Sequence, residues 1–190
     1  HIGLVITLLE LVDSKNKLRS SNATKESTIN NSVARSAYAY ISKWNSIEDA
    51  TFLGALLQDN IVPRFSEKTF SIEGKFFERG SLIVLRNDNR NAEFDSKLIA
   101  IANKHQRFLT AVSTGFSDSG VDFGSYSVKP INKQKIAVLS GKATSSLSFG
   151  EVWHYFETQL QYPITNINAD YFSDVTLDSY DVIILPSGSY

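Results

Sequence analysis

Two short runs near the end of the chain are apolar at every position, Ile-Ala-Val-Leu at residues 136–139 and Val-Ile-Ile-Leu at residues 182–185. A strand with one face in solvent alternates apolar and polar residues, whereas a strand of a parallel sheet is covered on both faces. A third strand candidate, residues 164–167, lies between the two runs. With the helix described next, the pattern predicts the first half of a doubly wound parallel sheet. Residues 182–185 would be central in the complete sheet, and without its remaining strands we expect them to be left partly uncovered.

An amphipathic segment follows the first apolar run. Its apolar residues recur at helical spacing and share one face: Phe149, Val152, Trp153, Phe156 and Leu160. We expect Ser148 to cap this helix at its start and Tyr162-Pro163 to end it, because the residue before a proline avoids helical dihedrals.

A separate α/β pattern precedes it. Strand candidates lie at residues 37–41, 61–65, 70–72, 75–77, 81–86 and 108–112. Glu73-Gly74 favours a hairpin turn, and Pro63 places its strand at a sheet edge or a bulge, because proline cannot donate to the ladder. Ser46 and Asp49 form a capping box that opens one helix, and residues 95–105 predict a second. The small and acidic residues 113–124 predict a linker or a functional loop.

The first segment, residues 2–18, is apolar early and charged late. A helix needs about 20 apolar residues to cross a bilayer, and this run has about half that number. We therefore expect a buried helix and no membrane span, with a truncated membrane anchor as the alternative. The chain begins with His1 and contains no Met, which predicts a processed chain or a fragment.

Charge and cysteine content exclude several classes of function. The 19 basic and 20 acidic residues give a net charge of -1, which argues against a nucleic-acid binder held by a broad basic face. The absence of Cys excludes a disulfide framework, a cysteine-ligated zinc site and a cysteine nucleophile within these residues.

The amino-acid sequence of the last third of the chain resembles that of a known family. The matching pieces are Ile-Ala-Val-Leu-Ser-Gly at 136–141, Phe-Gly-Glu-Val-Trp-His-Tyr-Phe at 149–156, Tyr-Pro at 162–163 and Tyr-Asp-Val-Ile-Ile-Leu-Pro-Ser-Gly at 180–188. They resemble the start of the class I glutamine amidotransferase-like domain that ends certain bacterial zinc-carboxypeptidase-like proteins. Upstream, residues 64–68, 79–83 and 113–116 look like the region that joins the peptidase and amidotransferase-like domains of such proteins.

The resemblance implies a fold and a division of the chain. The fold class would be α/β, a small connecting domain followed by a partial flavodoxin-like sheet. The segments would be a helical tail of an upstream peptidase domain with its linker (1–32), the connecting domain (33–118), a linker (119–134) and a truncated amidotransferase-like domain (135–190). The protein would be periplasmic or secreted, and an upstream metallopeptidase domain would bind zinc.

Two serine-glycine pairs are the candidate ligand-binding residues: Ser140 and Gly141 after the first strand, Ser187 and Gly188 after the third. Ligands of open α/β sheets bind beyond the carboxyl ends of strands. In amidotransferase relatives a glycine-rich turn at the second place supplies a backbone N–H to the oxyanion, and Ser187-Gly188 resembles that turn. The alternative is that both pairs are plain strand-to-helix turns.

His154 and Glu157 have the spacing of a His-x-x-Glu metal pair, and residues three apart share a helix face. Zinc needs at least a third protein ligand, and no His follows in the chain. We therefore favour the interpretation that both side chains lie on a helix surface and bind no metal. We expect no catalytic residue and no metal ligand in this chain.

Three functions stay open from sequence. The first is a non-catalytic, structural or accessory portion of a zinc-carboxypeptidase-like protein, whose partners are the upstream peptidase domain and the downstream remainder of the same chain. The second is a small-molecule-binding α/β module, and the third is a half-site of a glutamine amidotransferase-like enzyme. An incomplete sheet would also expose strand backbone and favour self-association.

Overall fold

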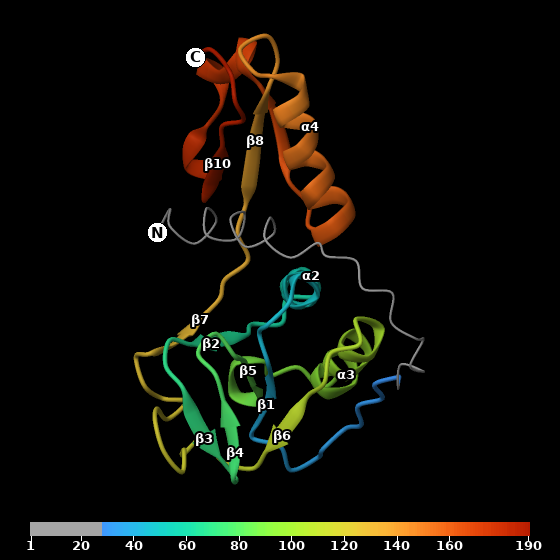
Figure 1. Cartoon of the computed structure of the whole chain (residues 1–190), viewed down its shortest axis with the longest axis vertical. Coiled ribbons are helices and arrows are strands. Elements are labelled where there is room, and N and C mark those ends of the chain that lie inside the picture. The colour runs from blue at the N-terminus through green and yellow to red at the C-terminus, as the bar shows by residue number, and fades with distance from the viewer. Residues whose placement is uncertain (1–27) are drawn as a thin grey trace, which may run out of the picture.

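The computed structural model describes residues 28–190 (Figure 1), and the helix predicted at residues 2–18 lies outside this range. The described chain is mixed α/β. An antiparallel sheet comes first, and a small three-stranded parallel sheet follows near the C-terminus. No helix within residues 28–190 is long and apolar enough to cross a membrane.

The antiparallel sheet has five strands in the order β6-β1-β5-β2-β7. The strands are β1 (Ala39–Ser42), β2 (Arg64–Ser66), β5 (Leu82–Leu85), β6 (Thr110–Val112) and β7 (Val128–Pro130). The first four fall within or beside predicted strands, and their pairing is antiparallel throughout.

β7 lies in the segment that the sequence assigns to a linker. It pairs with β2, so β2 is not the edge strand that Pro63 suggested. The strand begins one residue after Pro63, whose carbonyl accepts a hydrogen bond from the Ile131 N–H at 2.8 Å. Lys129 and Pro130 give β7 the features of a protected edge strand.

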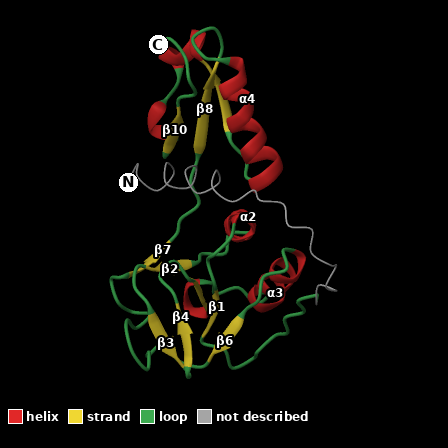
Figure 2. Cartoon of the chain, viewed as in Figure 1, coloured by secondary structure: helices red, strands yellow, loops and turns green. Residues whose placement is uncertain are grey.

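Both faces of this sheet are covered, as Figure 2 shows. Helices α2 (Ile47–Gln58) and α3 (Phe94–Lys104) pack on one face, where Leu82 and Val84 of β5 join the core. The hairpin of β3 (Phe70–Ile72) and β4 (Lys75–Phe77) covers the other face, where Ile83 and Leu85 are buried. β5 is therefore apolar at all four positions within an antiparallel sheet.

Two local predictions from turn and cap residues are confirmed. Glu73 and Gly74 both have positive φ, 50° and 70°, as the tightest hairpin turn requires. Asp49 accepts the backbone N–H of Asn45 and of Ser46, each at 2.8 Å, which caps the start of α2. Arg107 donates to the same carboxylate at 3.0 Å, so the cap also fastens the chain after α3.

The parallel sheet has the order β10-β8-β9. Its elements in chain order are β8 (Ile136–Ser140), α4 (Ser146–His154), the π-helix η2 (Tyr155–Leu160), β9 (Thr165–Asn168), the short 3-10 helices η3 (Ala169–Asp174) and η4 (Leu177–Ser179), and β10 (Val182–Ile184). Both pairings are parallel, and the three predicted strands are present.

One prediction for this unit is wrong, that of the helix cap. Among the described residues β8 is the central strand, and β10 pairs with β8 alone and has half-buried side chains, as an incomplete sheet predicts. The cap of α4 is Ser145, whose Oγ accepts the Ser148 N–H at 3.4 Å. Ser148 lies inside the first turn, because the helix begins at Ser146, earlier than the apolar periodicity indicates.

Candidate functional site

The two serine-glycine pairs lie at the carboxyl edge of the parallel sheet, and the structure brings their turns together. Ser145 donates its N–H to the Ser187 carbonyl at 2.7 Å, and Ser189 donates to the Ala143 carbonyl at 2.8 Å. Between these bonds Thr144 and Gly188 face each other as an antiparallel bridge. The loops after β8 and β10, at one end of the sheet in Figure 1, are therefore joined backbone to backbone.

Close packing requires glycine at both turns. Gly141 has φ of 103°, and a Cβ there would lie 2.6 Å from the Asn168 Oδ1. A Cβ on Gly188 would overlap the Ala143 carbonyl. The close approach of neighbouring atoms of the same chain explains why both positions are glycine, and no bound ligand is needed to explain it.

The serines at this edge also make hydrogen bonds within the chain. Ser140 donates its Oγ to the Ile167 carbonyl at 3.4 Å, across to β9. The Ser187 N–H donates to the Ser148 Oγ at 3.1 Å, which ties the turn after β10 to the first turn of α4. The Gly188 N–H, in contrast, makes no hydrogen bond to any residue within 28–190. Of the N–H groups of Ser187 and Gly188, only that of Gly188 could bind an acceptor from outside residues 28–190.

His154 and Glu157 do not converge on a shared site. The His154 Nδ1 lies 3.2 Å from the Thr158 Oγ1, and the Glu157 Oε2 accepts from the Trp153 Nε1 at 3.0 Å. Across the described part of the chain, no three side chains from His, Cys, Asp and Glu gather as a metal ion would require. The donors present in residues 28–190 do not fit the zinc of the resembled peptidase.

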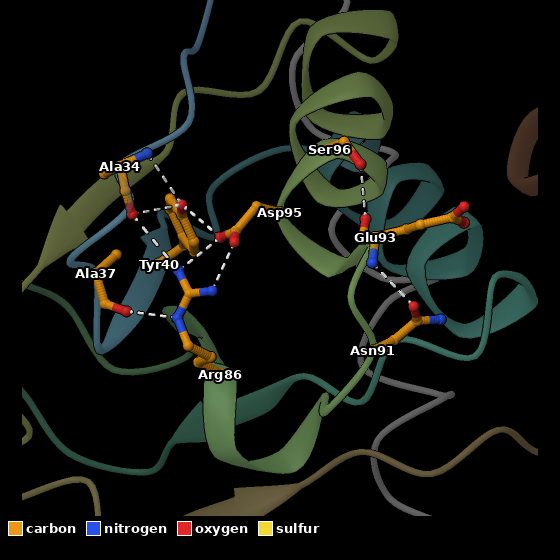
Figure 3. A network of polar contacts seen from close by, with 8 residues as sticks. All are labelled: Ala34, Ala37, Tyr40, Arg86, Asn91, Glu93, Asp95 and Ser96. Carbon is orange, nitrogen blue, oxygen red and sulfur yellow. Dashed lines mark hydrogen bonds and ion pairs between the residues drawn. The ribbon is translucent and has the colours of Figure 1, made fainter.

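Sequence reasoning missed a polar network in the antiparallel unit (Figure 3). The Arg86 guanidinium forms a fork with Asp95, with Nη1–Oδ2 at 2.5 Å and Nη2–Oδ1 at 2.7 Å. Tyr40 donates its hydroxyl to the Asp95 Oδ1 at 2.8 Å, and the Arg86 Nε donates to the Ala37 carbonyl at 2.8 Å. The guanidinium also lies 5.8 Å from the centre of the Phe94 ring. The network fastens the chain before β1 to the residue that follows β5 and to α3.

Charge pairing shifts the acidities in this network. The hydrogen bond to Asp95 raises the pKa of Arg86. Burial alone would raise the pKa of Asp95, but hydrogen bonds from Arg86 and Tyr40 outweigh burial and hold it below its ordinary value. Burial, and then the bond to Asp95, raise the pKa of Tyr40. Each group is held in its ordinary charge state, which suits a structural clamp better than proton transfer.

A depression of about 360 Å³ opens at the other end of the parallel sheet. Lys133, Lys135, Tyr162 and Tyr180 are among the residues that line it. It lies at the amino end of β8, opposite the serine-glycine turns, so it adds no volume to the candidate site.

The chain matches no protein family model, no curated protein and no solved structure.

Proposed function

We propose that this chain is a non-catalytic portion of a zinc-carboxypeptidase-like metallopeptidase. In this proposal an α/β connecting unit is followed by the first half of a flavodoxin-like, class I amidotransferase-like sheet. The observation that supports it best is the parallel strand order. Numbered along the chain, β9-β8-β10 reads 2-1-3, which is how the flavodoxin-like order 2-1-3-4-5 begins.

The proposed role is structural or accessory to peptide hydrolysis by another part of the same protein. Hydrogen bonds within the chain already use Ser140 Oγ and the Ser187 N–H, and backbone packing explains both glycines. Zinc would be held by the peptidase part, as the family resemblance implies. The partners would be that peptidase part and the remainder of the chain, in a periplasmic or secreted protein.

A half-site of a glutamine amidotransferase-like enzyme is the second candidate. The Gly188 N–H favours it, because this group follows the third strand and makes no hydrogen bond within residues 28–190. A backbone N–H in that position is the kind of donor that stabilises a developing oxyanion. The nucleophile would come from residues other than these, since the chain contains no Cys.

The natural polypeptide that contains this chain provides the test. We expect it to bind zinc and to release C-terminal residues from peptides, while the 190-residue chain alone hydrolyses neither such peptides nor glutamine. A natural polypeptide that binds no zinc and cleaves no peptide would overturn the proposal. Glutamine hydrolysis by the natural polypeptide would favour the half-site.

A further inference from the structure

The two units meet where α2 of the antiparallel unit packs against η2 of the parallel unit. Leu57, Phe156 and Tyr162 are buried together at this contact. The partly buried residues around them are Leu53, Ile131, Ile136, Val152, Tyr155, Leu160, Ile164 and Ile184. The contact is therefore an apolar core shared by the two units.

One face of α2 is fitted to the end of η2. Thr51, Gly54 and Gln58 lie at positions i, i+3 and i+7, which share a helix face. Thr51 donates its hydroxyl to the Gln159 carbonyl at 2.9 Å, and Gln58 donates its amide to the Gln161 carbonyl at 2.7 Å. A polar donor stands on each side of a glycine on this face.

Gly54 permits the close approach. A Cβ there would lie 3.4 Å from the Leu160 carbonyl oxygen and 3.5 Å from the Tyr162 ring, so a methyl group fits and a longer side chain does not. Glycine inside a helix costs about 0.5–1 kcal/mol relative to alanine. Its place at this contact gives it a packing reason.

The segment that receives these contacts is not an ordinary helix. Residues Tyr155–Leu160 are π-helical, Gln161 is left-handed with φ of 52°, and the Tyr162 N–H closes on the Phe156 carbonyl at 2.9 Å. Single π turns are rare, and the last carbonyls of any helix lack partners within it. Two of those carbonyls, Gln159 and Gln161, take their donors from α2.

We infer that docking on α2 holds this segment in its π-helical form, so that the wide turn is a conformational device that reports contact between the two units. The side chains of α2 satisfy two carbonyls at the end of the π-helical segment, and the shared apolar core favours the docked arrangement. When η2 is not docked on α2, the Gln159 and Gln161 carbonyls lose their donors on α2. The hydrogen bond from the Tyr162 N–H to the Phe156 carbonyl then breaks. This inference is independent of the proposed function, since it concerns two parts of the same chain.

Amide hydrogen exchange on the full chain tests the inference, with Gly54→Leu to block docking and Gly54→Ala as its matched control. We expect the amides of residues 159–162 to exchange about tenfold faster or more in Gly54→Leu and at the wild-type rate in Gly54→Ala. The amides of β5, in the middle of the antiparallel sheet, report whether the antiparallel unit stays folded.

A second variant keeps the test decisive if Gly54→Leu does not fold. Thr51→Val combined with Gln58→Leu removes both donors and leaves the apolar core in place. Faster exchange at Tyr162, with β5 unchanged and with backbone chemical shifts of residues 155–160 moving away from those of the wild type, supports the inference. Unchanged exchange and unchanged shifts in a folded variant overturn it.

Discussion

Tyr162 and Gln134 are joined by a reciprocal pair of hydrogen bonds. The Tyr162 hydroxyl donates to the Gln134 carbonyl at 2.7 Å and accepts the Gln134 N–H at 3.1 Å. The Tyr162 ring is at the same time part of the apolar core between α2 and η2. One side chain thus fixes the end of the π-helical segment to the chain that enters β8.

Replacing this hydroxyl gives the first prediction. Tyr162→Phe keeps the ring but leaves a backbone donor and acceptor of Gln134 without their partner, so we expect a loss of about 1–2 kcal/mol in the free energy of unfolding. Urea denaturation measures it. The matched control is Tyr171→Phe, at a tyrosine that is 65% exposed. Equal stability of the two variants would contradict the assigned role of the hydroxyl.

The clamp between Arg86 and Asp95 predicts an acid dependence. Because the pKa of Asp95 is lowered in the folded chain, the stability it contributes is present above about pH 4 and is lost as the pH falls through the folded pKa. We expect Asp95→Asn to cost about 1–2 kcal/mol at pH 7 and to flatten the fall in stability below pH 4. The free energy of unfolding is measured from pH 2.5 to 7 for the wild type, Asp95→Asn and the control Asp170→Asn. If it changes with pH in Asp95→Asn as it does in the wild type, the clamp does not contribute the expected stability.

His105 predicts a dependence in a different range. Burial lowers its pKa, and Lys104 and Arg107 add to the effect, so the folded chain favours the neutral ring. The unfolded chain then binds more protons, and this contribution to stability is full above about pH 6.5 and falls as the pH drops toward the folded pKa. His105→Gln should remove that slope between pH 5 and 7.5, while His154→Gln, at an exposed site, should keep it. If stability still falls with pH in this range in His105→Gln, another group is responsible for the dependence.

Two glycines of the parallel unit predict opposite responses to alanine. Gly188→Ala would press a methyl group onto the Ala143 carbonyl, so we expect a loss of about 1–3 kcal/mol and faster exchange of the Ser145 and Ser189 amides. Gly150→Ala, within α4 and with open space at its Cβ, should stabilise the chain by about 0.5–1 kcal/mol. Thermal unfolding of the two variants separates these outcomes, and a neutral Gly188→Ala would refute the close packing of the two turns.

The sequence predicts most strands and helices here because their cues are local. The exceptions depend on distant partners. The strand at β5 is predicted, but its apolar run does not indicate the direction of its neighbours, which are antiparallel, nor that helices and a hairpin cover its two faces. β7 has one apolar residue, Val128, so its place in the sheet comes from pairing with β2 rather than from periodicity.

The candidate site could be predicted from the sequence only in part. Strands that run parallel end at one edge, which places the turns of Ser140 and Ser187 on the same side of the sheet. The hydrogen bonds that join these turns, and the bond from Tyr40 to Asp95 in the clamp, link residues that are far apart in the chain. No spacing rule along a single sequence relates such pairs.

α4 continues directly into η2, so a single helical rod has one end on each unit. At its start the Ser148 Oγ accepts from the turn after β10, and its far end rests on α2. The apolar core between α2 and η2 also takes in Ile136 of β8 and Ile184 of β10, so α2 shares this core with the parallel sheet as well as with the end of this rod. The turn that carries Ser187 and the antiparallel unit are therefore connected through one continuous helical segment.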